Sequence, residues 1–160
     1  MRRAFGKTIV DIARKDPNIY LMTGDVVQEM GDYRLLFPDR FYNFGLAEQS
    51  IISMAAGMAS EGLRPVVYSI TPFLLERPFE QIKIDIDEQR LPVMLVGYAD
   101  YPLYGPTHRA LDEQALCKML KNTVSFFPRN AEETERAMIE GYLLKKPCII
   151  CLKKDGKHIL

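Results

Sequence analysis

The stretch YNFGLAEQSIISMAAGMASEGLRPVVYSI (residues 42–70) joins the end of a short apolar run, a helix-like segment and a second apolar run. Residues 47–61 are apolar nearly all round, a pattern typical of a helix buried on all sides. Residues 65–70 are continuously apolar, as in a parallel strand covered on both faces. This order of elements predicts a right-handed βαβ crossover. It also places Glu48 at the mouth of a buried helix, where the loss of water is costly for a carboxylate.

The same alternation of strand-like and helix-like segments continues along the chain. Further strand-like runs fall at 19–24, 92–98, 123–127 and 148–152, with a weaker run at 40–44. Helical patterns lie between these runs. We therefore predict an α/β fold, specifically a three-layer α/β/α sandwich with a mostly parallel sheet of about six strands. The chain is long enough to bury its own core, and we expect residues 1–160 to form one domain.

The helical segments carry predictions of their own. In LLERPFEQIKIDIDEQ, the side chains of Phe79, Ile82 and Ile86 fall on one face. Asp112 and Asn130 are predicted N-caps, the second in an arrangement similar to a capping box. Residues predicted to point inward from the helix after Asp112 are Leu116, Met119 and Leu120.

Composition and charge narrow the class of protein. Of the 160 residues, 21 are Lys or Arg and 21 are Asp or Glu, with no basic stripe for nucleic acid or an anionic membrane surface. No apolar run approaches the roughly 20 residues that span a bilayer, and the first residues lack the apolar core of a signal peptide. Three cysteines favour a reducing compartment and predict a cytoplasmic protein. Cys148 and Cys151 are spaced to face opposite sides of a strand, which predicts core residues rather than a metal site.

Polar and aromatic residues follow several of the predicted strands. Ligands of open parallel sheets bind just beyond the carboxyl ends of the strands, so these residues are expected to share one edge and form a pocket. They are Asp25, Glu48, Phe73, Arg77, Tyr101, Tyr104 and His108.

Several of these residues also have a structural alternative. Glu48 could stand at the helix N-terminus because an anion gains about 0.3–1 kcal/mol from the dipole there. Phe73 and Phe79 could be core residues, since aromatic side chains at helical spacing usually pack inward. Asp25 could be a turn residue, and His108 could be an ordinary surface histidine in its Gly-Pro-containing loop.

At these positions the sequence resembles the pyrimidine-binding domain of the transketolase family, which includes 1-deoxyxylulose-5-phosphate synthase and the β-subunits of 2-oxoacid dehydrogenases. GLAEQ (45–49) matches G-[LIV]-x-E-[QH], and AAGMASEG (55–62) matches A-A-G-x-A-x-x-G. TPFLLERPFEQI (71–82) is similar to the aromatic-containing segment ending in E-Q-I, and YGPTHRALDEQAL (104–116) to the G-P-T-H segment of transketolases. The resemblance covers roughly residues 1–152.

The resemblance implies roles for individual residues. The family's glutamate hydrogen-bonds N1′ of the aminopyrimidine of thiamine diphosphate and stabilises the imino tautomer that removes the thiazolium C2 proton. Glu48 occupies the matching position. Phe73 lies where an aromatic ring stacks on the pyrimidine, Phe79 is expected to close the same wall, and Asp25 lies near a loop facing the thiazolium. His108 matches the histidine that contacts the donor sugar.

The sequence also departs from the family pattern. It has no G-D-G motif followed by an Asn, the signature that holds Mg²⁺ and the diphosphate. The resemblance covers one domain and does not extend to the family's usual C-terminal domain, which we expect to be missing. The resemblance is therefore to the C-terminal subunit type of a split transketolase. It implies that thiamine diphosphate is shared with a diphosphate-binding partner that holds Mg²⁺, in a heterotetramer built around a homodimeric core.

The substrate-facing residues differ from the family as well. Tyr104 replaces the acid that commonly precedes G-P-T-H, and Gln49 resembles the deoxyxylulose-phosphate synthase branch. With His108 and Arg77, Tyr104 is expected to contact a sugar phosphate or nucleotide-sugar substrate. The resemblance thus implies transfer of a two-carbon ketol unit between sugars. A 2-oxo acid decarboxylase or dehydrogenase component and a non-catalytic assembly module remain the alternatives.

Overall fold

Six parallel strands form one sheet at the centre of the fold, in the order β2-β1-β3-β4-β6-β5. The computed structural model describes residues 1–27, 29–98 and 104–153. The strands are β1 (Ile19–Thr23), β2 (Phe41–Asn43), β3 (Arg64–Ile70), β4 (Met94–Tyr98), β5 (Val124–Phe126) and β6 (Cys148–Leu152). The helices are α1 (Arg2–Lys15), α2 (Gly31–Leu36), α3 (Glu48–Ser60), α4 (Phe79–Gln81), α5 (Glu113–Lys118) and α6 (Ala131–Leu144). The predicted α/β class with a parallel six-stranded sheet is confirmed.

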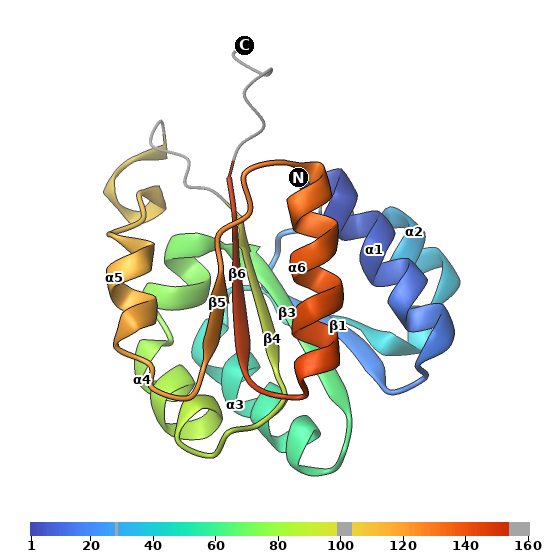
Figure 1. Cartoon of the computed structure of the whole chain (residues 1–160), viewed down its shortest axis with the longest axis horizontal. Coiled ribbons are helices and arrows are strands. Elements are labelled where there is room, and N and C mark those ends of the chain that lie inside the picture. The colour runs from blue at the N-terminus through green and yellow to red at the C-terminus, as the bar shows by residue number, and fades with distance from the viewer. Residues whose placement is uncertain (28, 99–103, 154–160) are drawn as a thin grey trace.

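Helices cover both faces of the sheet (Figure 1). Alternate residues of each strand point to opposite faces, so Val66 packs in one core cluster and Val67 in the other. Side chains of α1, α2 and α6 complete the first cluster. Side chains of α3 and α5 complete the second. This gives the three predicted layers, with α3 on the opposite face from α1.

Local sequence signals explain several of these elements. Asp112 Oδ1 accepts a hydrogen bond from the backbone N–H of Ala115, and Asn130 Oδ1 accepts one from that of Glu133, which confirms both predicted N-caps. Cys148 and Cys151 lie buried in different core clusters, as their spacing predicted. Burial raises the pKa of the Cys148 thiol to about 12, in keeping with a core residue.

Two helix predictions are wrong in part. The helix α3 is not buried on all sides, because Gln49, Ser53 and Met54 lie on an exposed face. The apolar composition of α3 correctly predicted burial only for the face that packs on the sheet. Met119 is 64% exposed rather than inward, because α5 ends at Lys118 and the chain turns before Leu120 enters the core.

The segment after β3 departs from one regular helix. It consists of a π-helical segment Pro72–Glu76, the short α4 and a second π-helical segment Ile82–Asp87. π-Helical turns are rare and occur often at functional sites. Ile82 and Ile86 are fully buried as predicted, whereas Phe79 is half-buried against the same core cluster.

Asp87 ends this segment as a buried polar junction. Its carboxylate is 2% exposed. It accepts hydrogen bonds from the backbone N–H groups of Lys121 and Asn122 at 3.1 and 2.9 Å, and from the Thr123 hydroxyl at 2.6 Å. Asp87 thereby fastens the turn before β5 to the helical layer.

None of the helices within the described residues is both long and apolar enough to span a membrane.

Candidate active site

Glu48 begins α3, directly beyond the carboxyl end of β2. Its side chain is 7% exposed. The chain leaves β1 toward β2 on one side, and leaves β3 toward β4 on the other, so the carboxyl ends of β1 and β3 form a topological switch point. Open α/β sheets bind their ligands at such points. The helix dipole also favours an anion at this position.

The segment before Glu48 is fixed by Asn43, which sequence reasoning missed. The Asn43 side-chain oxygen accepts hydrogen bonds from the backbone N–H groups of Asp25 and Gly45, both at 3.0 Å. These bonds tie the ends of β1 and β2 together. Gly24 is packed so closely here that an added Cβ would lie 2.8 Å from the Gly45 carbonyl oxygen and 3.2 Å from Ile51 Cδ1. The position of Glu48 therefore depends on a close backbone approach.

Replacing Gly24 with alanine is expected to displace this segment. The added methyl group meets a backbone oxygen that cannot rotate away, and overpacking of this kind costs about 1–3 kcal/mol. Gly57→Ala is the matched control, because no atom lies within 4 Å of its added Cβ and alanine is favoured in a helix. We expect urea unfolding to show a loss of stability for Gly24→Ala and none for Gly57→Ala. Equal stabilities would contradict the packing described above.

Arg77 reaches Glu48 from the segment after β3 and also lies over the ring of Phe73. The guanidinium carbon of Arg77 lies 3.6 Å from the centroid of the Phe73 ring. Its Nη1 donates a hydrogen bond to Glu48 Oε1 at 3.1 Å. The Arg77 backbone oxygen accepts a hydrogen bond from Gln49 Nε2 at 3.3 Å, which links this segment to α3. The planar cation of Arg77 thus links the buried carboxylate to the aromatic face.

His108 joins the same cluster. Its ring lies edge-on to Phe73 with a centroid distance of 4.8 Å, and the ring of the exposed Tyr104 lies 5.5 Å from it. His108 Nδ1 lies 3.0 Å from the Thr107 hydroxyl. The loop is anchored by Glu76, whose Oε1 accepts a hydrogen bond from the backbone N–H of Leu111 at 2.7 Å. The structure therefore brings His108 and Phe73 together, as the strand-end argument predicted.

The remaining predicted residues are not among those shown to contact the cluster of Glu48, Arg77, Phe73 and His108. Asp25 is exposed and has a left-handed φ of 65°, a geometry that fits its interpretation as a turn residue. Phe79 packs against the core on the α3 face, which fits its interpretation as a core residue. Tyr101 lies outside the described residues.

A small cavity of about 10 Å³ lies beside Glu48, lined also by Gly24, Ser69 and Pro78. The Ser69 hydroxyl is buried and has no hydrogen-bond partner among the described residues. Buried polar groups are normally satisfied, so the polar atoms around Glu48 are only partly used by the chain itself. Within the same described ranges, no cluster of three or more His, Cys, Asp or Glu side chains is placed to hold a metal ion.

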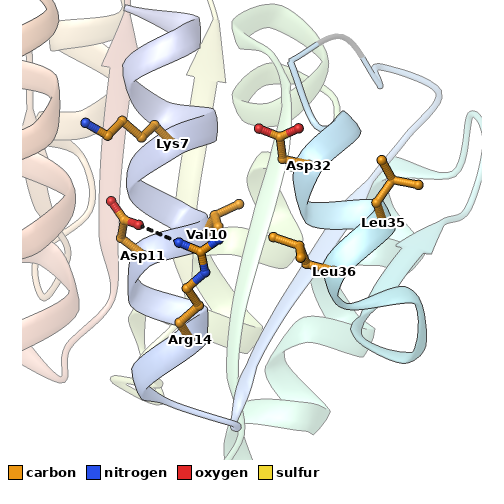
Figure 2. A pocket seen from close by; sticks show the side chains of 7 residues that line it. All are labelled: Lys7, Val10, Asp11, Arg14, Asp32, Leu35 and Leu36. Atoms are coloured by element: carbon orange, nitrogen blue, oxygen red, sulfur yellow. Dashed lines mark hydrogen bonds and ion pairs between the residues drawn. The ribbon is translucent and has the colours of Figure 1, made fainter.

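A larger surface pocket lies on the other side of the sheet. Its volume is about 330 Å³. Figure 2 shows the side chains of α1 and α2 that line it. Leu35 and Leu36 are 82% and 48% exposed there, and Asp11 and Arg14 form an ion pair at 3.5 Å on its α1 side. Because α1 and α3 cover opposite faces, this pocket is separate from the cluster at Glu48.

Comparison with known proteins identifies a matching family. Residues 1–156 match the family described as transketolase, pyrimidine binding domain. The 1-deoxy-D-xylulose-5-phosphate synthases of Syntrophotalea carbinolica and Carboxydothermus hydrogenoformans are 36% and 37% identical over 146 and 144 residues. These matches cover 86% and 84% of this chain but only 22% of each synthase.

Two solved structures are similar to this chain in fold. A protein described as "Split gene transketolase, inactive beta4 tetramer" superposes with a TM-score of 0.87 at 29% identity, covering 99% of this chain and 52% of its own. Transketolase from Leishmania mexicana superposes with a TM-score of 0.82 over 95% of this chain and 25% of its own, and at 17% identity it supports the fold alone.

Proposed function

Because this chain belongs to the family of transketolase pyrimidine-binding domains, we propose that it is the pyrimidine-binding half of a thiamine-diphosphate-dependent enzyme. The proposed reaction is the transfer of a two-carbon ketol unit between sugar substrates. One observation supports this most strongly: a buried carboxylate, Glu48, hydrogen-bonds a planar N–H donor that is stacked on Phe73. An aminopyrimidine ring protonated at N1′ presents the same features, a flat face and an N–H at its edge.

The residues of this chain then have distinct tasks. Glu48 would share one proton with N1′ of the pyrimidine: the protonated carboxyl donates to N1′, and the carboxylate then accepts from N1′–H, which sets the tautomer of the ring. Phe73 supplies the flat wall against which the ring lies. Thiamine diphosphate, when bound, supplies the carbon nucleophile, while the protein orients it. The partly satisfied polar surroundings of Glu48 fit a ligand of this kind.

The diphosphate and its Mg²⁺ are proposed to be held by a partner subunit. Mg²⁺ with a diphosphate needs oxygen ligands in near-octahedral geometry, and the 160 residues contain no G-D-G motif followed by an Asn. The structural neighbour described as a split gene transketolase supports a division of the site between polypeptides. We propose a heterotetramer in which two copies of this chain meet two diphosphate-binding subunits. The free cysteines Cys117, Cys148 and Cys151 fit a cytoplasmic location.

The substrate is proposed to enter over His108 and Tyr104. His108 is half-buried and Tyr104 is 70% exposed, so together they offer a hydrogen-bonding ring and a phenol at the mouth of the site. A hydroxyl-rich donor needs such partners, since polar groups left unpaired in a site weaken binding strongly. A sugar phosphate or nucleotide-sugar suits this surface.

Replacing His108 with alanine is expected to discriminate between ketose and 2-oxo acid donors. In the assembled enzyme, we expect His108→Ala to lower kcat/KM for a ketose donor by about 10–100-fold more than for pyruvate, because only the ketose loses hydrogen bonds. His108→Gln, which keeps a hydrogen-bonding group, should recover part of this difference. Equal losses for both donors would favour the 2-oxo acid decarboxylase or dehydrogenase component instead.

A further inference from the structure

The Arg77 side chain makes both contacts that the proposed function assigns to the cofactor ring. Its guanidinium carbon lies 3.6 Å above the Phe73 ring, and its Nη1 lies 3.1 Å from Glu48 Oε1. A guanidinium within about 6 Å of an aromatic centroid is attracted by the ring quadrupole. A hydrogen bond from a cation to a carboxylate is stronger than one between neutral groups.

A guanidinium and an N1′-protonated aminopyrimidine are similar in shape and charge. Both are planar, both spread a positive charge over conjugated nitrogen atoms, and both can direct an N–H at a carboxylate while presenting a flat face to an aromatic ring. At 3.6 Å the guanidinium is already in van der Waals contact with Phe73. No planar ring can enter between the two, so Arg77 and a pyrimidine cannot occupy this face together.

We propose that Arg77 is a placeholder for the aminopyrimidine ring, occupying its site in the cofactor-free chain and leaving when the cofactor binds. The proposal rests on the proposed function, because it takes Glu48 and Phe73 as the pyrimidine site. Its physical reason is the burial of Glu48, whose side chain is 7% exposed. A buried carboxylate without a partner is strongly destabilising, and Arg77 provides that partner until the ring replaces it.

The geometry allows this exchange without refolding. Both backbone polar groups of Arg77 are hydrogen-bonded. Its N–H donates to the Pro72 carbonyl oxygen, and its own carbonyl oxygen accepts from Gln49 Nε2, both at 3.3 Å. The side chain is 36% exposed, in contrast to Glu48. The guanidinium can therefore rotate outward into water while the backbone of the segment stays in place.

While Arg77 occupies the site, the apparent affinity of the chain for a pyrimidine ring is lowered. If Arg77 fills the pocket in about nine of ten molecules, a pyrimidine binds about ten-fold more weakly than to an open pocket. The full-length chain can be tested for this with the isolated pyrimidine half of thiamine, 4-amino-5-hydroxymethyl-2-methylpyrimidine, by calorimetric titration. We expect Arg77→Ala to bind this probe about ten-fold or more tightly than the unaltered chain does.

Three variants make the titration specific. Arg129 also pairs with a carboxylate, since its Nη2 lies 3.2 Å from Glu133 Oε1, but it lies far along the chain from Glu48. The Arg129→Ala variant should therefore bind the probe as the unaltered chain does. Adding Glu48→Gln to Arg77→Ala should abolish the gain. Arg77→Lys keeps the charge but not the plane, and should bind with intermediate affinity.

The outcomes separate the two proposals. Binding that depends on Glu48 but is unchanged or weakened in Arg77→Ala would overturn the placeholder and leave the pyrimidine site standing. Binding that ignores Glu48, or no binding by any variant, would overturn both.

A second measurement on the unaltered chain does not depend on the folding of a variant. The Arg77 side-chain N–H signals in ¹⁵N NMR should lose their protection from exchange with water at saturating probe. Signals that remain protected at saturation would contradict displacement.

Discussion

Replacing Glu48 with glutamine is expected to abolish turnover of the assembled enzyme, with a loss of about 10²–10⁴-fold, the range of a positioned proton-transfer group. Glutamine has nearly the same shape, so the site should keep its packing. Its amide cannot hold the proton that a carboxylate holds at N1′. The measurement is ketol transfer by the complex of this chain with the proposed diphosphate-binding partner.

A control for this variant is available directly after the same helix. Glu61 follows α3 at its C-terminal end and is exposed, so Glu61→Gln should leave turnover unchanged. Size-exclusion chromatography should show that both variants assemble as the unaltered chain does. Full activity of assembled Glu48→Gln would rule out the proposed role of the carboxylate.

The largest effect on stability is expected at Asp87. In Asp87→Ala, the backbone N–H groups of Lys121 and Asn122 and the hydroxyl of Thr123 lose the carboxylate that accepts from them. Hydrogen bonds to charged groups contribute about 1.5–3 kcal/mol each, and buried donors left unsatisfied add to the loss. We expect the free energy of unfolding to fall by more than about 3 kcal/mol, measured by urea denaturation.

Asp85 offers a comparison two residues away. It is less buried than Asp87, and its Oδ2 accepts a single hydrogen bond at 2.6 Å, from the Ser53 hydroxyl. Asp85→Ala should therefore change the free energy of unfolding by only about 1 kcal/mol. Similar losses in the two variants would show that Asp87 is not the junction that the structure describes.

Much of the fold followed from the sequence because the strands are buried on both faces. A strand such as Met94–Tyr98 reads as a continuous apolar run, and the N-caps Asp112 and Asn130 mark helix starts by local hydrogen bonding. The π-helical turns after β3 were not predictable in this way, because they come from tertiary packing of the segment rather than from a periodic pattern. The exposed face of α3 was missed since small and apolar residues do not reveal which side meets the sheet.

The sequence predicted which residues of the candidate site lie near one another, because the strand topology determines this. It did not predict contacts that depend on the direction of a side chain. The carboxyl ends of parallel strands meet at one edge, so Glu48, Phe73 and His108 were expected near one another, and Phe73 and His108 are in contact. The pairing of Arg77 with Glu48 depends on a rotamer and on the turn at Pro72–Glu76, neither of which the sequence pattern specifies. The bonds of Asn43 to two strand ends likewise arise only in the folded chain.

We propose that this chain completes a thiamine-diphosphate site with a second subunit. Its most direct test is to isolate the tagged chain in its native complex from the source organism, identify the bound proteins by mass spectrometry and quantify thiamine diphosphate in the same sample. We predict a stoichiometric partner that carries G-D-G followed by an Asn, with about one cofactor for each copy of this chain. A complex that contains neither this partner nor the cofactor would contradict a shared thiamine-diphosphate site and favour a non-catalytic assembly module.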